Sequence, residues 1–426
     1  MQRRWTSAAA AITALALVMG ACGGAGTGGT TGATTAKTVK IISSLPMTGS
    51  SRTQTVEIVN SIKMAIDETK IPNVTVQYEA LDDATAAKGS WDAAQEAENA
   101  RKAINDKTVV AYIGTYNSGA AKVSIPLLNQ AGLVMVSPAN TYPGLTKTGK
   151  GEANEPGVYY PSGKRNYARV VPADDLQGAV GAVWAKELGA KNVYIVHDTE
   201  LYGKGIADVF RAKAKELGLT EKGYEGAQKA DNYRALANKI KDSGADLLYY
   251  GGIVDNNPAV MAKDLKAVAP TVKFMGPDGI NCSEFLKQAG PSGEGIYSTF
   301  GGVPPEKYTG KAAEWLKNYN AKFNNKNPNA YAIYGYEAAK VVLAAIAKSG
   351  DKADDRATVL ANVMGTKDYD GVLGKWSFDA SGDTTLTQFS GSIGKSLSEP
   401  SRVVRAHSAS RVSSFRSGPV KSSFCC

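Results

Sequence analysis

Residues 109–136 read VVAYIGTYNSGAAKVSIPLLNQAGLVMV, and this stretch decides the fold class. Its first five residues are an apolar, β-branched run that is typical of a buried strand. A loop of small and hydroxyl side chains follows, and residues 119–130 predict a helix that Pro126 kinks or begins. Residues 133–136 form a second buried-strand run. A strand, a helix and a strand joined in this way indicate a parallel sheet with helices on its faces.

The same alternation extends along the chain in both directions. Upstream, we expect strands at 38–42 and 74–78 and helices at 53–70 and 90–105. Downstream, we expect helices at 174–188, 203–217, 231–242 and 258–268, with strands at 192–196, 246–250 and 272–275. The last part predicts helices at 307–323, 330–348 and 354–363, a hairpin or bent strand at 369–378 and a strand at 384–389. A Pro- and Gly-rich loop at 137–165 separates two αβ sets, so we expect two lobes, each with a doubly wound sheet.

The chain of 426 residues has a formal net charge of +9, and most of this charge lies at its ends. Arg3 and Arg4 contribute two charges, and residues 395–426 contribute a net five, so +2 remains for residues 22–394. A body this close to neutrality gives no electrostatic reason to expect nucleic acid as a partner.

The N-terminus predicts an export signal followed by a lipid anchor. A short basic region precedes the apolar residues 8–18, which are too few to span a bilayer. Met19-Gly20-Ala21-Cys22 resembles the cleavage site of a bacterial lipoprotein, with residues 1–21 as the signal and Cys22 as the lipid attachment site. An ordinary signal peptide with a chance cysteine is the alternative. Residues 22–37, rich in Gly, Ala and Thr, read as a flexible tether.

The C-terminus, residues 395–426, is Ser- and Arg-rich and ends in Cys425-Cys426. It has no clear hydrophobic period, so we expect it to be a disordered tail. It is either a basic arm for anionic partners or, as we favour, an extension that is foreign to the fold, such as the product of a shifted reading frame.

The loops that follow the predicted strands hold the candidate binding chemistry, because ligands of doubly wound sheets sit beyond the carboxyl ends of the strands. These loops are SSLPMTGSSR at 43–52, GTYNSG at 114–119, SPANT at 137–141, HDTELYG at 197–203, GGIVD at 251–255 and GPDG at 276–279. Hydroxyls, backbone N–H groups and helix N-termini suit a small anionic group such as a carboxylate. Asp278 is a candidate counter-charge for a cation, so the loops together would suit a zwitterion.

Catalytic alternatives find little support in the sequence. It contains no GxSxG elbow, Walker A loop, HExxH or paired CxxC, so we expect no enzyme activity, no metal and no cofactor. His197 beside Asp198 could act as a base, but a hydrogen-bonded histidine at a strand end is the commoner situation. Cys282 lacks an evident activating partner and is expected to be a buried packing residue.

Several segments resemble the branched-chain amino acid (Leu/Ile/Val) periplasmic-binding proteins, which are solute receptors of ATP-driven importers. The segments are SLPMTG, YIGTYNSG, VSPANT, IVHDTELYGKG, LLYYGG and FMGPDG, and the resemblance covers about residues 40–390 in matching order. It implies a type I periplasmic binding protein, with two lobes joined by a three-strand hinge. The N-terminal lobe would be 38–170 plus 300–372, and the C-terminal lobe 171–299 plus 373–394.

The resemblance also implies roles for individual residues. Ser118, Ala139 and Thr141, with the intervening Asn140, match the family positions that hold an α-carboxylate. Tyr202 matches the tyrosine that lines the wall of the second lobe.

Other positions depart from the family pattern. Asp278 stands where branched-chain binders typically have glutamate for the ammonium, and it is one methylene shorter. Ile253 stands where an aromatic side chain is usual. Thr48 and Arg52 lie in the first loop, where Arg52 could face solvent or pair with a second ligand carboxylate, and the 137–165 loop could rim the cleft.

The function implied is an extracytoplasmic receptor that binds an amino acid, branched-chain or otherwise small and apolar, between its lobes. Its expected partners are the permease and ATPase subunits of an importer and, through the lipid, the bacterial cell membrane, and we expect a monomer. The alternative is a binder or sensor of another small carboxylate, amide or urea-type ligand on the same scaffold.

Overall fold

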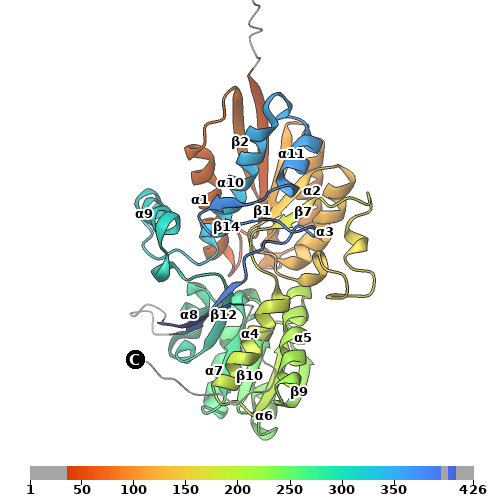
Figure 1. Ribbon diagram of the computed structural model, residues 1–426. Coiled ribbons are helices and arrows are strands. Elements are labelled where there is room, and N and C mark those ends of the chain that lie inside the picture. The colour runs from red at the N-terminus through yellow and green to blue at the C-terminus, as the bar shows by residue number, and fades with distance from the viewer. Residues whose placement is uncertain (1–35, 395–401, 409–426) are drawn as a thin grey trace, which may run out of the picture. The chain divides into compact units, whose positions relative to one another are not determined.

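The first of two main sheets is parallel throughout and has the strand order β2-β1-β5-β6-β7, of which β1, β2 and β7 are labelled in Figure 1. The computed structural model describes residues 36–394 and the backbone of 402–408. The strands are β1 (Lys37–Leu45), β2 (Val74–Asp82), β5 (Val109–Gly114), β6 (Val134–Ser137) and β7 (Tyr167–Arg169). The two-stranded pair β3 (Ala84–Thr85) and β4 (Ser90–Trp91) lies outside this sheet.

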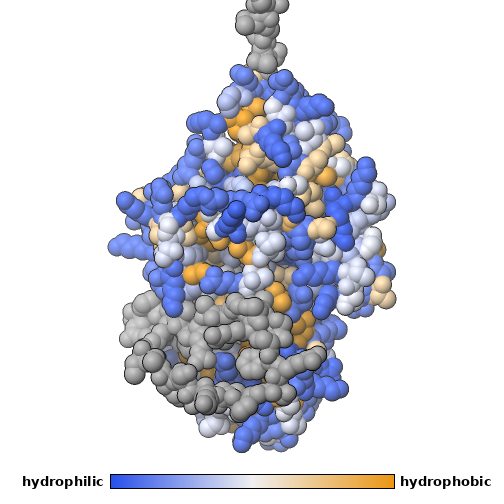
Figure 2. Space-filling view, in the orientation of Figure 1, coloured by the Kyte–Doolittle hydropathy of each residue, from blue (hydrophilic) through white to orange (hydrophobic). Residues whose placement is uncertain are grey.

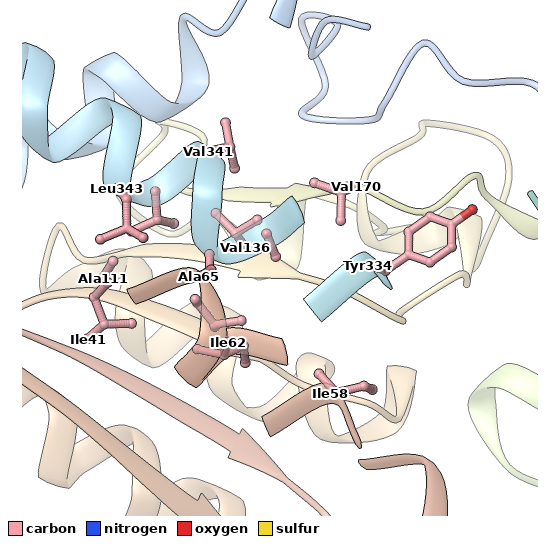
Figure 3. Packing of buried hydrophobic residues seen from close by; sticks show 14 of the residues in the cluster. Ile41, Ile58, Ile62, Ala65, Ala111, Val136, Val170, Tyr334, Val341 and Leu343 are labelled. Atoms are coloured by element: carbon pink, nitrogen blue, oxygen red, sulfur yellow. The ribbon is translucent and has the colours of Figure 1, made fainter. Parts of the chain in front are cut away.

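Helices cover both faces of this first sheet, and successive residues of a strand pack on opposite faces. Ala111 and Ile113 belong to a core cluster with α1 (Arg52–Glu68) and α10 (Ala332–Ser349) (Figure 3). Tyr112 belongs to a separate cluster with α2 (Ala93–Asn105) and α3 (Ser118–Gln130). Because successive side chains of a strand point to opposite faces, a strand buried on both faces is apolar throughout. This burial explains why residues 109–113 contain no polar side chain other than tyrosine.

Two helices that are far apart in the sequence meet on one face of the first sheet. Gly335 of α10 lies so close to α1 that a Cβ atom there would stand 2.7 Å from the Ile58 side chain. The small residue therefore permits the close contact of α1 with α10 (Figure 3). The last part of the chain thus completes the core that residues 37–169 begin.

The second main sheet has the order β16-β15-β12-β11-β10-β8-β9. Its parallel strands are β8 (Asn192–His197), β9 (Thr220–Gly226), β10 (Leu247–Gly251), β11 (Lys273–Gly276) and β12 (Tyr297–Gly301). The clusters on its two faces contain α4 (Asp174–Glu187) and α5 (Leu201–Glu216) on one side, and α6 (Arg234–Asp242), α7 (Pro258–Val268) and α8 (Ser283–Ala289) on the other. The fold is therefore α/β with two doubly wound lobes, as the sequence predicted, and three connections cross between the sheets.

Two strands at the edge of the second sheet are antiparallel, unlike the rest. β15 (Gln388–Ile393) pairs with β12, and β16 (Arg402–Ser408) pairs with β15. The expected strand at 384–389 therefore starts four residues later, and the expectation that 395–426 lacks structure is wrong for 402–408. β15 would otherwise present unpaired backbone groups along its outer side, and this segment covers them. The rest of the predicted tail, like the predicted signal and tether up to residue 35, lies outside the described residues.

The predicted boundary at residue 373 needs one correction. The hairpin β13 (Tyr369–Gly371) and β14 (Gly374–Trp376) packs on the first lobe, because Trp376 and Phe378 belong to the core of α1 and α10. The indole N–H of Trp376 also donates to Glu337 Oε1 at 2.6 Å, on α10. Residues 373–378 therefore lie with the first lobe, together with α9 (Gly310–Phe323) and α11 (Arg356–Met364).

The surface in view is largely hydrophilic between smaller apolar areas (Figure 2). Val158 is the exposed large hydrophobic residue among those described. Within the described ranges, the structure has no helix with the length and apolar character that a membrane span requires.

A buried carboxyl in the first lobe makes stability depend on pH. Glu96 of α2 is fully buried and accepts from Ser44 Oγ at 2.5 Å and from the Tyr112 hydroxyl at 2.9 Å. Burial raises the pKa of Glu96 from 4.5 to about 7, against the opposing effect of these hydroxyls. The folded state therefore binds the proton of the Glu96 carboxyl more tightly than the unfolded state does. Protonated Glu96 stabilises the fold fully below about pH 4.5, and this stabilisation is lost as the pH rises toward 7.

We predict that Glu96→Gln, which cannot ionise, will lose less stability between pH 5 and pH 8 than the wild type does. The expected difference is roughly 2 kcal/mol, measured by urea unfolding at both pH values. Glu98→Gln, on the exposed part of the same helix, is the control and should follow the wild type. Parallel pH dependences of Glu96→Gln and wild type would contradict the prediction.

Candidate functional site

A small cavity lies where loops at the carboxyl ends of both sheets meet. The free space among its lining side chains is about 270 Å³, part of which is open to solvent. The residues that line it are Tyr116, Asn117, Ser118, Ala139, Thr141, Tyr202, Ile253, Asp278, Gly279 and Tyr331. Those from the first lobe follow β5 and β6 or begin α10, and those from the second lobe follow β8, β10 and β11. The location agrees with the rule for ligands of doubly wound sheets.

The first lobe offers hydroxyls and a helix N-terminus to the cavity. Ser118 is the first residue of α3, where the backbone N–H groups of the first turn carry partial positive charge. Its Oγ accepts from the backbone N–H of Tyr142 at 3.3 Å, which leaves the hydroxyl proton for another acceptor. Thr141 Oγ1 and Asn117 Oδ1 are buried without a hydrogen-bond partner in the structure. Unpaired buried polar atoms are costly, so this wall is suited to an occupant that supplies the missing partners.

The second lobe places a carboxylate opposite these hydroxyls. Asp278 Oδ1 accepts from Gln177 Nε2 at 2.6 Å and from the Tyr202 hydroxyl at 2.8 Å. Its Oδ2 accepts from the hydroxyl of Tyr331, which begins α10 on the first lobe. Burial raises the pKa of Asp278 above its ordinary value, and the three donors oppose this rise. A cation in the cavity would favour the ionised form further.

A second buried acid, Asp174, stands close to Asp278. It begins α4 and is fully buried, and no hydrogen bond of good geometry reaches its carboxyl oxygens. Burial and the charge of Asp278 raise its pKa well above the ordinary value, while the nearby Thr141 hydroxyl and the Arg169 charge oppose the rise. Two buried carboxyls with no cation between them favour a positively charged occupant over a purely anionic one.

Six of the nine predicted ligand-contacting residues line the cavity. They are Ser118, Ala139, Thr141, Tyr202, Ile253 and Asp278. Their contact with a ligand stays a prediction, but the structure brings them together from five separate loops.

The other three predicted residues lie elsewhere, each for a physical reason. Thr48 Oγ1 donates to Asp82 Oδ2 at 2.8 Å and so fixes the first loop. Arg52 begins α1 with its side chain exposed, away from the cavity. Asn140 is fully buried and donates to the Tyr116 carbonyl at 3.0 Å, so it holds the cavity loops from behind.

Sequence reasoning missed several residues of the site. Tyr116 and Asn117 stand beside Ser118 in the GTYNSG loop, and their proximity was a usable signal. Tyr331 reaches the cavity from the start of α10, more than 200 residues from that loop, and no local pattern marks it. Asp174 and Gln177 were expected only as parts of a helix.

The side chains that could have supported catalysis lie outside the cavity. His197 Nδ1 accepts from the backbone N–H of Thr199 at 3.1 Å, and burial lowers the pKa of this histidine. Cys282 is buried, and burial raises the pKa of its thiol to about 12. Within residues 36–394, no group of three His, Cys, Asp or Glu side chains could hold a metal ion.

Arg169 fixes the loop that carries Ala139 and Thr141. Its guanidinium donates to the carbonyl of Tyr142 at 2.9 Å and to the hydroxyl of Thr146, and its Nε donates to Asp383 Oδ1 at 2.7 Å. Although burial opposes it, the Arg169 charge holds the pKa of Asp383 below its ordinary value. Arg169 lies at the first connection between the sheets and Asp383 on the third, so one ion pair ties two connections to the cavity loop.

Comparisons with known proteins agree with this geometry. A family model described as periplasmic binding protein matches residues 38–389. A Leu/Ile/Val-binding protein homolog 1 from Brucella melitensis is 31% identical over 278 residues, which cover 64% of this chain and 69% of the relative. Two solved structures have the same fold. A leucine binding protein LivK from Thermotoga maritima has a TM-score of 0.77 at 24% identity, covering 88% of this chain and 99% of its own. A solute binding protein from Rhodopseudomonas palustris in complex with p-hydroxybenzoic acid has a TM-score of 0.74 at 18% identity, covering 87% and 97%.

We predict that Arg169→Leu will lower the free energy of unfolding by about 3–5 kcal/mol, because it leaves Asp383 buried without its main partner. The double variant Arg169→Leu/Asp383→Leu should recover part of this loss, because it leaves neither charge behind. Urea unfolding of both variants and the wild type measures the effect. A double variant no more stable than Arg169→Leu would show that the ion pair is not the cause.

Proposed function

The chain belongs to the periplasmic binding protein family, and on that premise we propose that it is the extracytoplasmic solute receptor of an ATP-driven importer. The ligand we propose is an amino acid, branched-chain or otherwise small and apolar. The protein would hold it between the lobes and deliver it to a permease. The family is one of binding proteins, and we propose that this member has no enzyme activity.

This proposal rests on one observation: the small cavity has hydrogen-bond donors on one wall and a buried carboxyl on the opposite wall. Ser118, Thr141 and the N-terminus of α3 offer donors that suit an α-carboxylate. Asp278 offers a buried carboxyl that suits an α-ammonium, and the buried Asp174, which does not line the cavity itself, adds negative charge near Asp278. A zwitterion satisfies both walls, whereas an ion of either sign alone leaves one wall without its partner.

The remaining wall points to an apolar ligand side chain of limited size. Ile253 is buried in a cluster with Tyr202 and Ile206, and the Tyr116 ring closes the cavity from the first lobe. The free space of about 270 Å³, although part of it is open to solvent, limits the occupant to a small molecule. The name of the Leu/Ile/Val-binding relative supports a ligand of this kind.

Binding would act on the arrangement of the two lobes, because ligand contacts come from both. A zwitterion would touch the first lobe through its carboxylate and the second lobe through its ammonium, so it gains all its contacts only when the lobes are together. Tyr331 already spans from α10 to Asp278 in this way. The closed, loaded form would be the one that the permease recognises.

An aromatic carboxylate is the second candidate ligand. Three tyrosines line the cavity, Tyr116, Tyr202 and Tyr331, and a solved relative of the same fold holds p-hydroxybenzoic acid. The pair Asp174 and Asp278 argues against it, because a benzoate brings no cation to these acids. Neutral amides and urea-type ligands also bring no cation to these acids, although their N–H groups can donate hydrogen bonds to them.

We further propose that Cys22 carries a lipid and that the protein works as a monomer outside the bacterial cell membrane. The basic and apolar residues before Cys22 and the Gly-, Ala- and Thr-rich stretch after it support this proposal.

We predict that a free small apolar amino acid will raise the melting temperature of the purified protein in a thermal-shift panel, and that benzoate, urea and simple amides will raise it less. Mass spectrometry of ligand released on denaturation identifies the natural occupant. In calorimetry, Asp278→Asn should weaken amino-acid binding by about 30-fold or more, because the ammonium loses its counter-charge.

Asp264→Asn is the matched control for Asp278→Asn, because Asp264 also accepts a hydrogen bond in the second lobe, from the backbone N–H of Tyr233 at 2.6 Å, but lies outside the cavity. It should leave the affinity within about twofold of wild type. Benzoate as the strongest ligand, or unchanged amino-acid binding in Asp278→Asn, would reject the amino-acid proposal.

We predict that the wild type, produced in a bacterial host, will incorporate an alkyne-labelled fatty acid and sediment with membranes. Cys22→Ala should lose the label and move to the soluble fraction. Cys282→Ala, which changes a buried cysteine of the folded body, is the control and should keep the label. A labelled Cys22→Ala protein would disprove the attachment site.

A further inference from the structure

A side chain of the second lobe caps a helix of the first lobe, outside the cavity. Asp255 follows β10 in the short helix η3 (Val254–Asn256), and its Oδ1 accepts from the backbone N–H of Ser51 at 2.9 Å. Its Oδ2 accepts from the Ser51 hydroxyl. Ser51 is the N-cap of α1, yet its own side chain caps no N–H, and the first turn of α1 has no acidic residue. A negative charge is favourable at the N-terminus of a helix, and for α1 this charge comes from Asp255 of the other lobe.

A second contact of the same kind runs from the first lobe to the second. Asn329 precedes α10, and its Oδ1 accepts from the backbone N–H of Ser283, the first residue of α8, at 3.1 Å. Glu57 of α1 accepts from the Asn329 side-chain amide at 3.0 Å and from its backbone N–H at 2.6 Å. With the amide nitrogen directed to Glu57, the amide oxygen is directed to Ser283.

A third hydrogen bond joins the same surfaces. Gln288 Nε2 of α8 donates to Ser50 Oγ at 3.0 Å. Gly49 lies close to both surfaces, because a Cβ atom there would stand 3.3 Å from Asp255 Oδ1 of the second lobe and 2.0 Å from the Gly89 carbonyl of its own lobe. Gly49 has a φ of 92°, which favours glycine for a second reason.

These contacts form one inter-lobe latch, by which we mean the hydrogen bonds of Asp255, Asn329 and Gln288 to the opposite lobe. None of its residues lines the cavity. Each bond has its donor on one lobe and its acceptor on the other, so each exists only while the lobes are together. The latch therefore stabilises the closed arrangement without touching what the cavity holds.

We propose that Asp255 and Asn329 are positioning residues that set the affinity of the cavity for its ligand from outside it. This inference rests on the proposed function in one respect, namely that a small molecule binds between the lobes. The apparent dissociation constant is the intrinsic constant divided by the fraction of molecules in the competent, closed form. Loss of the latch lowers that fraction and weakens every ligand by the same factor. A contact residue would instead discriminate between ligands.

The test compares Asp255→Ala, Ser51→Ala and the double variant with wild type. Calorimetry with leucine and with alanine measures affinity, and small-angle scattering of the ligand-free protein measures its radius of gyration. Asp255→Ala should raise both dissociation constants by about tenfold and by a common factor, since hydrogen bonds to a charged group are among the stronger ones. The double variant should lose less than the product of the two single losses, because both partners belong to one contact.

Asp264→Ala is the matched control, because Asp264 likewise accepts the backbone N–H at the start of a helix, α6, but within its own lobe. It should lower the melting temperature and leave both dissociation constants within about twofold of wild type. Asp255→Asn, which keeps an oxygen for the Ser51 N–H, should recover part of the affinity.

Scattering separates failure of this inference from failure of the proposed function. If wild type binds neither amino acid, the function fails, and the latch stands only if Asp255→Ala enlarges the ligand-free radius of gyration. If wild type binds, unchanged affinity in Asp255→Ala, or losses that differ several-fold between leucine and alanine, would overturn the latch. Should Asp255→Ala fail to fold, Ser51→Ala carries the same comparison.

Discussion

The buried ion pair of Arg169 and Asp383 is the interaction on which the arrangement of this protein depends. It joins the end of β7 to the third connection between the sheets, and the same guanidinium holds the carbonyl of Tyr142 and the hydroxyl of Thr146. The loop with Ala139 and Thr141 is thereby fixed to the point about which the lobes would move. Two charges removed from water are stable only when both stay paired, so this junction has little freedom to rearrange. A rigid junction lets the lobes move as units while the loop at the cavity keeps its shape.

The cavity differs from this junction, because some of its polar groups are buried without a full set of hydrogen-bonding or charge partners in the protein. Asp174 and Asp278 are raised in pKa by burial, and Thr141 and Asn117 keep unpaired atoms. Each of these groups costs free energy while it lacks a partner, and under the proposed function a matching ligand group would recover that cost. Selectivity then follows, because a molecule that lacks either charge leaves part of that cost in place. Where the resemblance implies that the walls depart from the branched-chain pattern, as at Ile253 and Asp278, the same reasoning predicts a different choice of ligand rather than a loss of binding.

The sequence predicted the regular part of this structure well, because burial on both faces of a sheet forces apolar runs such as residues 109–113. It also predicted the loops after the strands, in which loop chemistry marked Asp278 and the family resemblance marked Ser118 and Thr141, and all three line the cavity. It did not reveal Tyr331 or Asp174, because their roles come from the packing of separate helices. Of the two alternatives that the sequence left open for Arg52, the structure shows the exposed one, since a residue in the right loop can still point to solvent. The boundary at 373 failed because Trp376 is fixed by Glu337, a contact between α10 and a hairpin that no local period records.

The completion of the first core by α10 has a consequence for how the chain matures. Residues 37–169 supply every strand of the first sheet, but the helix that packs on α1 comes only with residues 332–349. A chain interrupted after β12 would therefore display the apolar side of α1, and its second sheet would lack the strand that covers β12. Neither lobe can finish before nearly the whole polypeptide exists, so assembly is set by long-range contacts and is slow to begin. If the chain crosses the membrane before it folds, as the proposed export signal implies, then this order of elements is an advantage, because it delays folding.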